Sequence, residues 1–314
     1  MCGIELELLL FDAGNRDLVR NYELVEDILH GLPRNIWRDW YPYQLELKTK
    51  PADKPKDAIK EMKELYRTST DAFKEHDIYV IPATSISTND CMYCGLHTHI
   101  SYPNETREVF FDRAMGIYPY ILSLADHCKN FETTELNTSN RLRNSHHIRL
   151  PQLNKERFYS TRIPNSDRKY RDIIYSPRIR EGESENERAR MIKPDTMEIR
   201  MLDTPSLFSF FVYQIETIYN LASRIKDNNP LVQMLSSNYN KTESALRMSR
   251  ELAIHQRYGM NKIFRMSNFG VCELLSEYFN ITFPNQTQFE FREEKGLSAN
   301  TNGFICMAIE GGWL

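Results

Sequence analysis

Short segments in which ionisable and apolar residues alternate place the strongest constraint on the fold of this chain. Side chains two residues apart on a β-strand point to the same face of the sheet. In residues 3–11, Glu5 and Glu7 therefore share one face, while Ile4, Leu6 and Leu8 take the other. Other segments repeat this pattern with Gln44, Glu46 and Lys48, with His97 and His99, and with Glu198 and Arg200. We expect four strands, each apolar on one face and ionisable on the other.

The intervening sequence has the spacing of helices packed on a sheet. Apolar residues recur at helical intervals, and Pro55 suits a first helical turn. The pattern predicts an extended segment over residues 78–87 and helices over residues 17–32, 55–76, 105–127, 207–224 and 242–258. We therefore predict one α+β domain over residues 1–314. Its antiparallel sheet presents the ionisable side chains on one concave face, and helices pack on the other.

The composition narrows the class of protein. Hydrophobic residues make up 41% of the chain and aromatic residues 11%, which is typical of a folded core and not of a disordered chain. A net charge of −3 gives no reason to expect nucleic acid or a membrane as a partner. The six cysteines fit a reduced compartment, and we expect no targeting signal, because acids interrupt the apolar run at the start of the sequence. We expect a cytoplasmic protein, with a homo-oligomer left open.

The ionisable strand faces have two interpretations, a hydrated face and a metal site. A hydrated face is common in antiparallel sheets. Such a face usually mixes Lys, Thr, Ser and Gln with acids, whereas here glutamate and histidine dominate. Two glutamates on one strand face also repel each other unless a cation lies between them. Carboxylates are the preferred ligands of magnesium or manganese, and an imidazole can complete such a site.

A basic region follows these strands. Between residues 141 and 200, lysine and arginine outnumber aspartate and glutamate by 15 to 9. Arginine suits the anionic groups of a nucleotide because its planar donors match phosphate oxygens. Acids for metal together with arginines for phosphate favour ATP chemistry.

The same residues carry a resemblance to a known family. Gly3-Ile-Glu-Leu-Glu7 resembles the opening strand of the glutamate–cysteine ligase type family, and Gly95-Leu-His-Thr-His-Ile-Ser101 is similar to a strand of glutamine synthetase and of these ligases. Gln44-Leu-Glu46 with Thr49 and Pro51 resembles their Val-Glu-x-x-Thr-Pro strand, with one extra residue before the proline. Met197-Glu-Ile-Arg-Met-Leu-Asp203 resembles their Leu-Glu-x-Arg-x-x-Asp segment. The motifs occur in family order over roughly residues 1–205, and the last hundred or so residues match nothing in it.

The resemblance implies a glutamine synthetase-like catalytic domain that uses ATP and magnesium. A small-molecule or peptide carboxylate would be joined to an amine in an amide or isopeptide bond, through an acyl phosphate. It implies that His99 lies near the ATP phosphates and that Arg200, beside Glu198, stabilises the transferred phosphoryl group. The metal ligands that it implies are Glu5, Glu7, Glu46, His97 and Glu198.

Two other functions fit parts of the sequence. Cys91 and Cys94 precede His97 and His99, so these four residues could form the zinc site of an interaction module without enzymatic activity. The phosphagen kinases resemble the same catalytic domain, so a guanidino group could accept the phosphoryl group in place of a carboxylate.

Overall fold

The computed structural model describes residues 1–15, 17–83, 94–101, 173–175, 196–226, 291, 294–296, 309–310 and 312–314. Within these ranges, the side chains of residues 173–175, 196–198, 200, 201, 203 and 221–226 are not described. The helices expected over residues 105–127 and 242–258 lie outside the described part of the chain.

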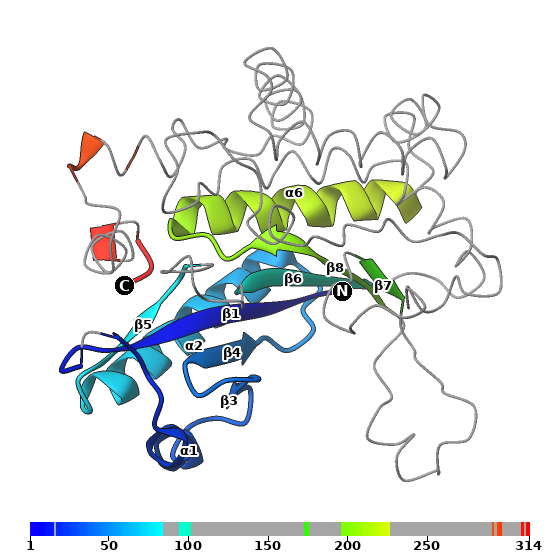
Figure 1. Cartoon of the computed structure of the whole chain (residues 1–314). Helices are drawn as coiled ribbons and strands as arrows, with labels where there is room; N and C mark the ends of the chain where they lie inside the picture. Colours follow the sequence, from blue (N-terminus) through cyan, green and yellow to red (C-terminus); the bar gives the residue numbers. More distant parts are fainter. Residues whose placement is uncertain are drawn as a thin grey trace, which may run out of the picture.

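The centre of the fold is an antiparallel sheet (Figure 1). Its main path runs in the order β3-β4-β1-β6-β8-β7, and β2 and β5 also pair with β1. The long strand β1 therefore pairs directly with four others, β2, β4, β5 and β6. The strands are β1 (Cys2–Asp12), β2 (Asp17–Leu18), β3 (Ile36–Arg38), β4 (Gln44–Lys48), β5 (Ile78–Ile81), β6 (Gly95–Ser101), β7 (Ile173–Tyr175) and β8 (Thr196–Asp203).

The register of the sheet gathers the ionisable residues on one face. Glu7 of β1 lies opposite Glu46 of β4, and Glu5 lies opposite Lys48 on the same side. On the other edge of β1, Glu5 lies opposite His97 of β6. Residues directly opposite each other in an antiparallel pair project to the same face. The alternation thus sets which face each side chain occupies, and the register of the strands sets which of them lie opposite each other.

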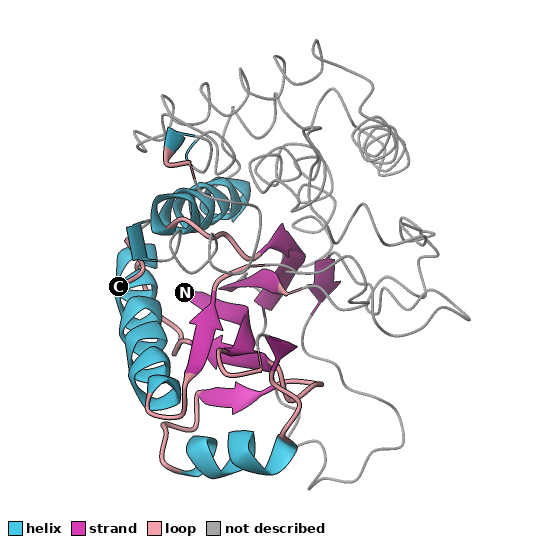
Figure 2. Ribbon diagram, turned by 60° about the vertical axis from the view of Figure 1, so that its left-hand side comes forward, coloured by secondary structure: helices cyan, strands magenta, loops and turns pink. Residues whose placement is uncertain are grey.

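Helices cover the apolar face, as Figure 2 shows for the long helices beside the sheet. α2 (Pro55–Lys74) and α6 (Phe208–Lys226) contribute to one buried cluster with the apolar residues of β1, β4, β6 and β8. Within it, Ile4, Leu6 and Leu8 of β1 are almost fully buried. Trp313, close to the C-terminus, is fully buried in the same cluster. Within the described ranges, no helix combines the length and apolarity that crossing a bilayer requires.

Four elements differ from the sequence-based prediction. The first helix, α1 (Tyr22–His30), is shorter than residues 17–32 because Asn21 caps its N-terminus by accepting a hydrogen bond from the Leu24 N–H. Residues 17 and 18 instead form β2 against the end of β1. The strands β3 and β7 were not predicted, since each has only three residues and such a run carries no readable period.

Candidate active site

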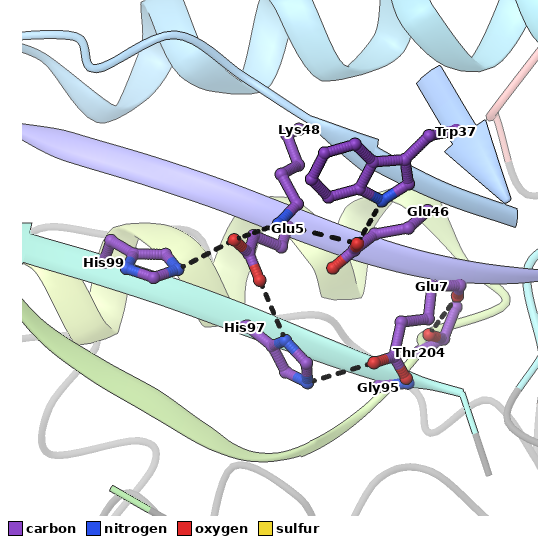
Figure 3. A network of polar contacts seen from close by, with 9 residues as sticks. All are labelled: Glu5, Glu7, Trp37, Glu46, Lys48, Gly95, His97, His99 and Thr204. Carbon is purple, nitrogen blue, oxygen red and sulfur yellow. Dashed lines mark hydrogen bonds and ion pairs between the residues drawn. The ribbon is translucent and has the colours of Figure 1, made fainter. Parts of the chain in front are cut away.

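Four ionisable side chains are buried together on the polar face of the sheet. Glu5 and Glu7 come from β1, Glu46 from β4 and His97 from β6, and their exposed fractions are 6%, 4%, 7% and 0%. Figure 3 shows the carboxylates of both β1 glutamates directed at the His97 ring. Acids are almost never this buried unless they are paired with a cation or a donor. The network of contacts around them therefore decides what the site can do.

Glu5 contacts three cationic or potentially cationic groups. Its Oε1 lies 2.8 Å from Lys48 Nζ and 3.3 Å from His99 Nε2, and its Oε2 lies 3.3 Å from His97 Nδ1. Burial opposes ionisation of this carboxyl, but hydrogen bonds to His97 and His99 and the charge of Lys48 together hold the pKa of Glu5 below its usual range. Glu5 is therefore a carboxylate at neutral pH, which is the form that binds a metal ion.

Glu7 is held by the neighbouring strand. The backbone N–H of Gly95 donates to its Oε2 at 2.7 Å, and its Oε1 lies 3.5 Å from His97 Nε2. The Thr204 hydroxyl donates to the Glu7 backbone carbonyl at 2.6 Å. The His97 ring thus lies between two carboxylates, one facing each nitrogen. A neutral imidazole has one N–H, so one of its nitrogens keeps a lone pair available to a ligand.

Glu46 has fewer partners. The indole Nε1 of Trp37 donates to its Oε2, and Lys48 Nζ lies 3.5 Å from the same oxygen. Burial, followed by the nearby charge of Glu5, raises the pKa of Glu46 to about 8. Because burial and the charge of Glu5 disfavour the ionised form of Glu46, a cation bound here would favour that form.

The geometry fits a divalent cation. Glu5, Glu46 and His97 each offer one ligand atom, and these atoms lie within 4.8 Å of one another. Carboxylate oxygens with a single imidazole suit magnesium or manganese better than softer metals. Glu7 is adjacent but outside this trio of ligand atoms, since its oxygens face Gly95 and His97. With His99, which contacts Glu5, the described residues thus bring together five of the predicted site residues.

The remaining predicted residues come from β6 and β8. His99 lies beside Glu5, and its backbone pairs with that of Glu198. The side chains of Glu198 and Arg200 are among those not described. The register between β6 and β8 shifts by one residue between Leu96 and Thr98, next to Arg200. Their roles stay predictions.

Two residues of the network were missed from the sequence. Lys48 was expected on this face but had no role, and Trp37 was not considered. The Lys48 ammonium lies 4.1 Å from the centre of the Trp37 ring, so the two contact each other as well as Glu46. The alternation of side chains along β4 could have identified Lys48 as a member of the site. Nothing in the sequence points to Trp37, because β3 has only three residues and shows no readable alternation.

The three described residues of the zinc alternative, Cys94, His97 and His99, give it no support. Cys94 packs in an apolar cluster with Leu9, Ile81 and Leu207, among others. Cys91 lies outside the described residues. Among the described residues, the group able to hold a metal consists of two carboxylates and an imidazole, without a cysteine.

Comparison with known proteins adds a likeness of fold. No protein-family model and no curated protein matches the sequence. The structure is similar to that of a bifunctional glutathione synthetase from Pasteurella multocida, with a TM-score of 0.55 and 14% identity over 99% of this chain and 51% of that one. It is also similar to a glutamate–cysteine ligase from Francisella tularensis solved in complex with AMP, with a TM-score of 0.54 and 14% identity over 99% of this chain and 87% of that one.

This likeness supports the predicted antiparallel sheet with helices packed on one side, and the concave shape of its polar face stays a prediction. The chain has the fold of the carboxylate–amine ligases related to glutamate–cysteine ligase, and spans about half the length of the bifunctional enzyme.

Proposed function

We propose that this protein is an ATP- and magnesium-dependent carboxylate–amine ligase. It would form an amide or isopeptide bond between a small-molecule or peptide carboxylate and an amine, through an acyl phosphate, in the cytoplasm. One observation carries the proposal: Glu5, Glu46 and His97 bring ligand atoms within 4.8 Å of one another on the buried polar face of a ligase-type sheet.

The metal-binding part of the proposal assigns Glu5, Glu46 and His97 as central ligands, with Glu7 and Glu198 completing the set. Magnesium held by these residues would supply charge neutralisation at the phosphates of ATP. Glu7 is well suited to a fixed role, since Gly95 and Thr204 hold its side chain and its backbone. Fixed ligands contribute to catalysis because no reorganisation is needed when the charge develops.

The phosphate-binding part assigns His99 and Arg200. His99 is a neighbour of Glu5 and lies opposite Glu198 in the register of β6 and β8. Arg200 follows two residues later, and its planar guanidinium suits the equatorial oxygens of a moving phosphoryl group. The amine then attacks the acyl phosphate and phosphate leaves. The chain's own residues orient the reactants and stabilise charge, which is most of what phosphoryl transfer requires.

The test is a screen for ADP release over pairs of amino-acid and peptide carboxylates with amines, followed by mass analysis. We expect ADP only when ATP, magnesium and both substrates are present, with a product equal in mass to the two substrates less one water. Glu5→Gln should abolish ADP release, and the exposed Glu64→Gln is the matched control. A phosphorylated guanidino product would establish the kinase alternative. ADP release unaffected by Glu5→Gln would overturn the assigned site.

A further inference from the structure

A lysine occupies the centre of the acidic cluster. Lys48 Nζ lies 2.8 Å from Glu5 Oε1 and 3.5 Å from Glu46 Oε2. Its ammonium also lies over the Trp37 ring at 4.1 Å from the ring centre. Figure 3 shows the side chain reaching from β4 toward both carboxylates. The ammonium therefore contacts the Glu5 carboxylate, a Glu46 oxygen and an aromatic face, which together make a well-defined binding position for a positive charge.

This position overlaps the candidate metal site. Glu5 and Glu46 are two of the three residues whose ligand atoms lie within 4.8 Å of one another, and Lys48 holds an oxygen of each. A divalent ion bound by Glu5, Glu46 and His97 needs oxygens from the same two carboxylates. An ammonium and a divalent cation repel each other at such short range, so full occupancy of both is unfavourable.

The Lys48 side chain can move out of its position between Glu5 and Glu46. Its side chain is 25% exposed, whereas those of Glu5 and Glu46 are below 10%. Lysine has a long flexible stem and a strongly hydrated ammonium, so its charge can move into solvent when another cation takes its place. The carboxylates cannot move in this way because their strands are paired on both edges.

We propose that Lys48 is a built-in cation that occupies the Glu5–Glu46 part of the metal site when no metal is bound and is displaced by the incoming divalent ion. The inference rests on the metal site of the proposed function. In the metal-free protein Lys48 offsets the buried charge of Glu5 and contacts the neighbouring Glu46 carboxyl group. The cost is weaker metal binding, since the ion must first break the Lys48 contacts. Lys48 thereby sets the concentration of metal at which the site fills.

The experiment is a titration of the full chain with Mn²⁺ in the absence of nucleotide, with free Mn²⁺ followed by electron paramagnetic resonance. Lys48→Met removes the charge and keeps most of the stem. We expect it to bind Mn²⁺ about 10- to 100-fold more tightly than the parent, the usual range of a coupling between two binding events. The matched control is Lys50→Met, which removes an exposed lysine two residues along the chain. It should leave the affinity unchanged, and Lys48→Arg should show no tightening.

Each result decides the question. Equal or weaker Mn²⁺ binding by Lys48→Met would overturn the inference and leave the proposed function standing. Absence of Mn²⁺ binding in both proteins would overturn the inference and the metal site together. Mn²⁺ binding by Lys48→Met and not by the parent would support the inference, because the lysine would then exclude the ion completely.

A folding control covers the case in which Lys48→Met is unstable without metal. Circular dichroism should then show recovery of the fold on addition of Mn²⁺, because the ion replaces the missing charge. A variant that stays unfolded at every Mn²⁺ concentration would count against exchange between lysine and metal.

Discussion

The backbone N–H of Gly95 donates a 2.7 Å hydrogen bond to Oε2 of Glu7, a residue 88 positions away in the chain. The bond joins the start of β6 to the middle of β1 and directs the other oxygen of Glu7 toward His97, at 3.5 Å. The orientation of this carboxylate is thus set by a neighbouring strand, and its position does not depend on solvent.

The first prediction follows from that orientation. In Glu7→Gln, the amide oxygen can still accept from Gly95, so the fold should be retained. The loss of the negative charge should reduce magnesium-dependent ATP turnover by about a hundredfold or more, because a neutral amide is a poor ligand for a hard cation. ADP release measures the activity, and thermal unfolding checks the fold. Glu64→Gln on the exposed side of α2 serves as the control, and turnover at the parent's rate would argue against a role for Glu7 in metal binding.

The second prediction concerns stability and pH in the metal-free protein. Glu46 has a pKa raised to about 8, from an ordinary value of 4.5. The folded state therefore holds this proton more tightly than the unfolded state, so the stabilising contribution of the protonated carboxyl is lost as the pH rises between these two values. Glu46→Gln cannot ionise.

We expect Glu46→Gln to melt a few degrees above the parent at about pH 9 in the presence of a chelator, with the difference shrinking toward about pH 5. Melting curves of both proteins across this range measure the effect. A difference that grows toward acidic pH would contradict the assigned direction.

Much of this site could be predicted because it depends on short-range patterns. The i, i+2 spacing in β1, β4 and β6 determines which face each glutamate and histidine occupies, and pairing with β1 then brings those faces together. The start of α2 at Pro55 was also readable from the sequence. Such features are set by residues close together in the chain.

The rest depends on contacts between distant residues. Lys48 meets Glu5 only because the β1–β4 register places them opposite each other. Trp37 meets Glu46 because the short β3 pairs with β4, and Arg38 Nε anchors β3 to α1 through a 2.7 Å contact with Glu26. A strand of three residues carries no usable periodicity, so sequence alone gave no reason to place an indole beside the carboxylates.

The third prediction uses Trp37 as a reporter. Its indole contacts both Glu46 and Lys48, so displacement of the lysine by magnesium changes its surroundings. We expect addition of magnesium to change tryptophan fluorescence in the parent and in Trp40→Phe, since Trp40 is 76% exposed. The change should be lost in Trp37→Phe. A signal that persists without Trp37 would show that magnesium acts elsewhere.

The fourth prediction tests the core near the C-terminus. Trp313 is fully buried and packs against Tyr66 of α2 and Phe208 and Phe211 of α6, with ring centres 4.9–5.1 Å apart. Trp313→Ala should lower the free energy of unfolding by about 3–5 kcal/mol, the usual cost of removing a large buried aromatic side chain. Urea denaturation measures it. Leu314→Ala, at the exposed neighbour, should change stability little, and equal effects of the two would contradict the packing role.

The last prediction concerns Arg200, since it tests the reaction as well as the fold. Arg200 lies in β8, two residues after Glu198, whose backbone pairs with that of His99 beside Glu5. Phosphoryl transfer spreads negative charge over the equatorial oxygens of the moving group, and a planar fork of donors matches that geometry better than an ammonium does. Arg200→Lys keeps the positive charge but replaces the planar set of guanidinium donors with an ammonium group.

We therefore expect Arg200→Lys to raise the activation free energy by about 3 kcal/mol, which lowers turnover by about a hundredfold. This is the usual effect of losing a single donor to the transition state. ATP affinity should change much less, because the contact matters most after the phosphoryl group has begun to move. The exposed Arg67 on α2 provides the matched control, and Arg67→Lys should leave both quantities unchanged. If Arg200 instead forms a structural ion pair, lysine replaces it with little effect on turnover. Turnover and nucleotide binding measured on the two variants separate these roles, and equal losses in both quantities for Arg200→Lys would count against a contact specific to the transition state.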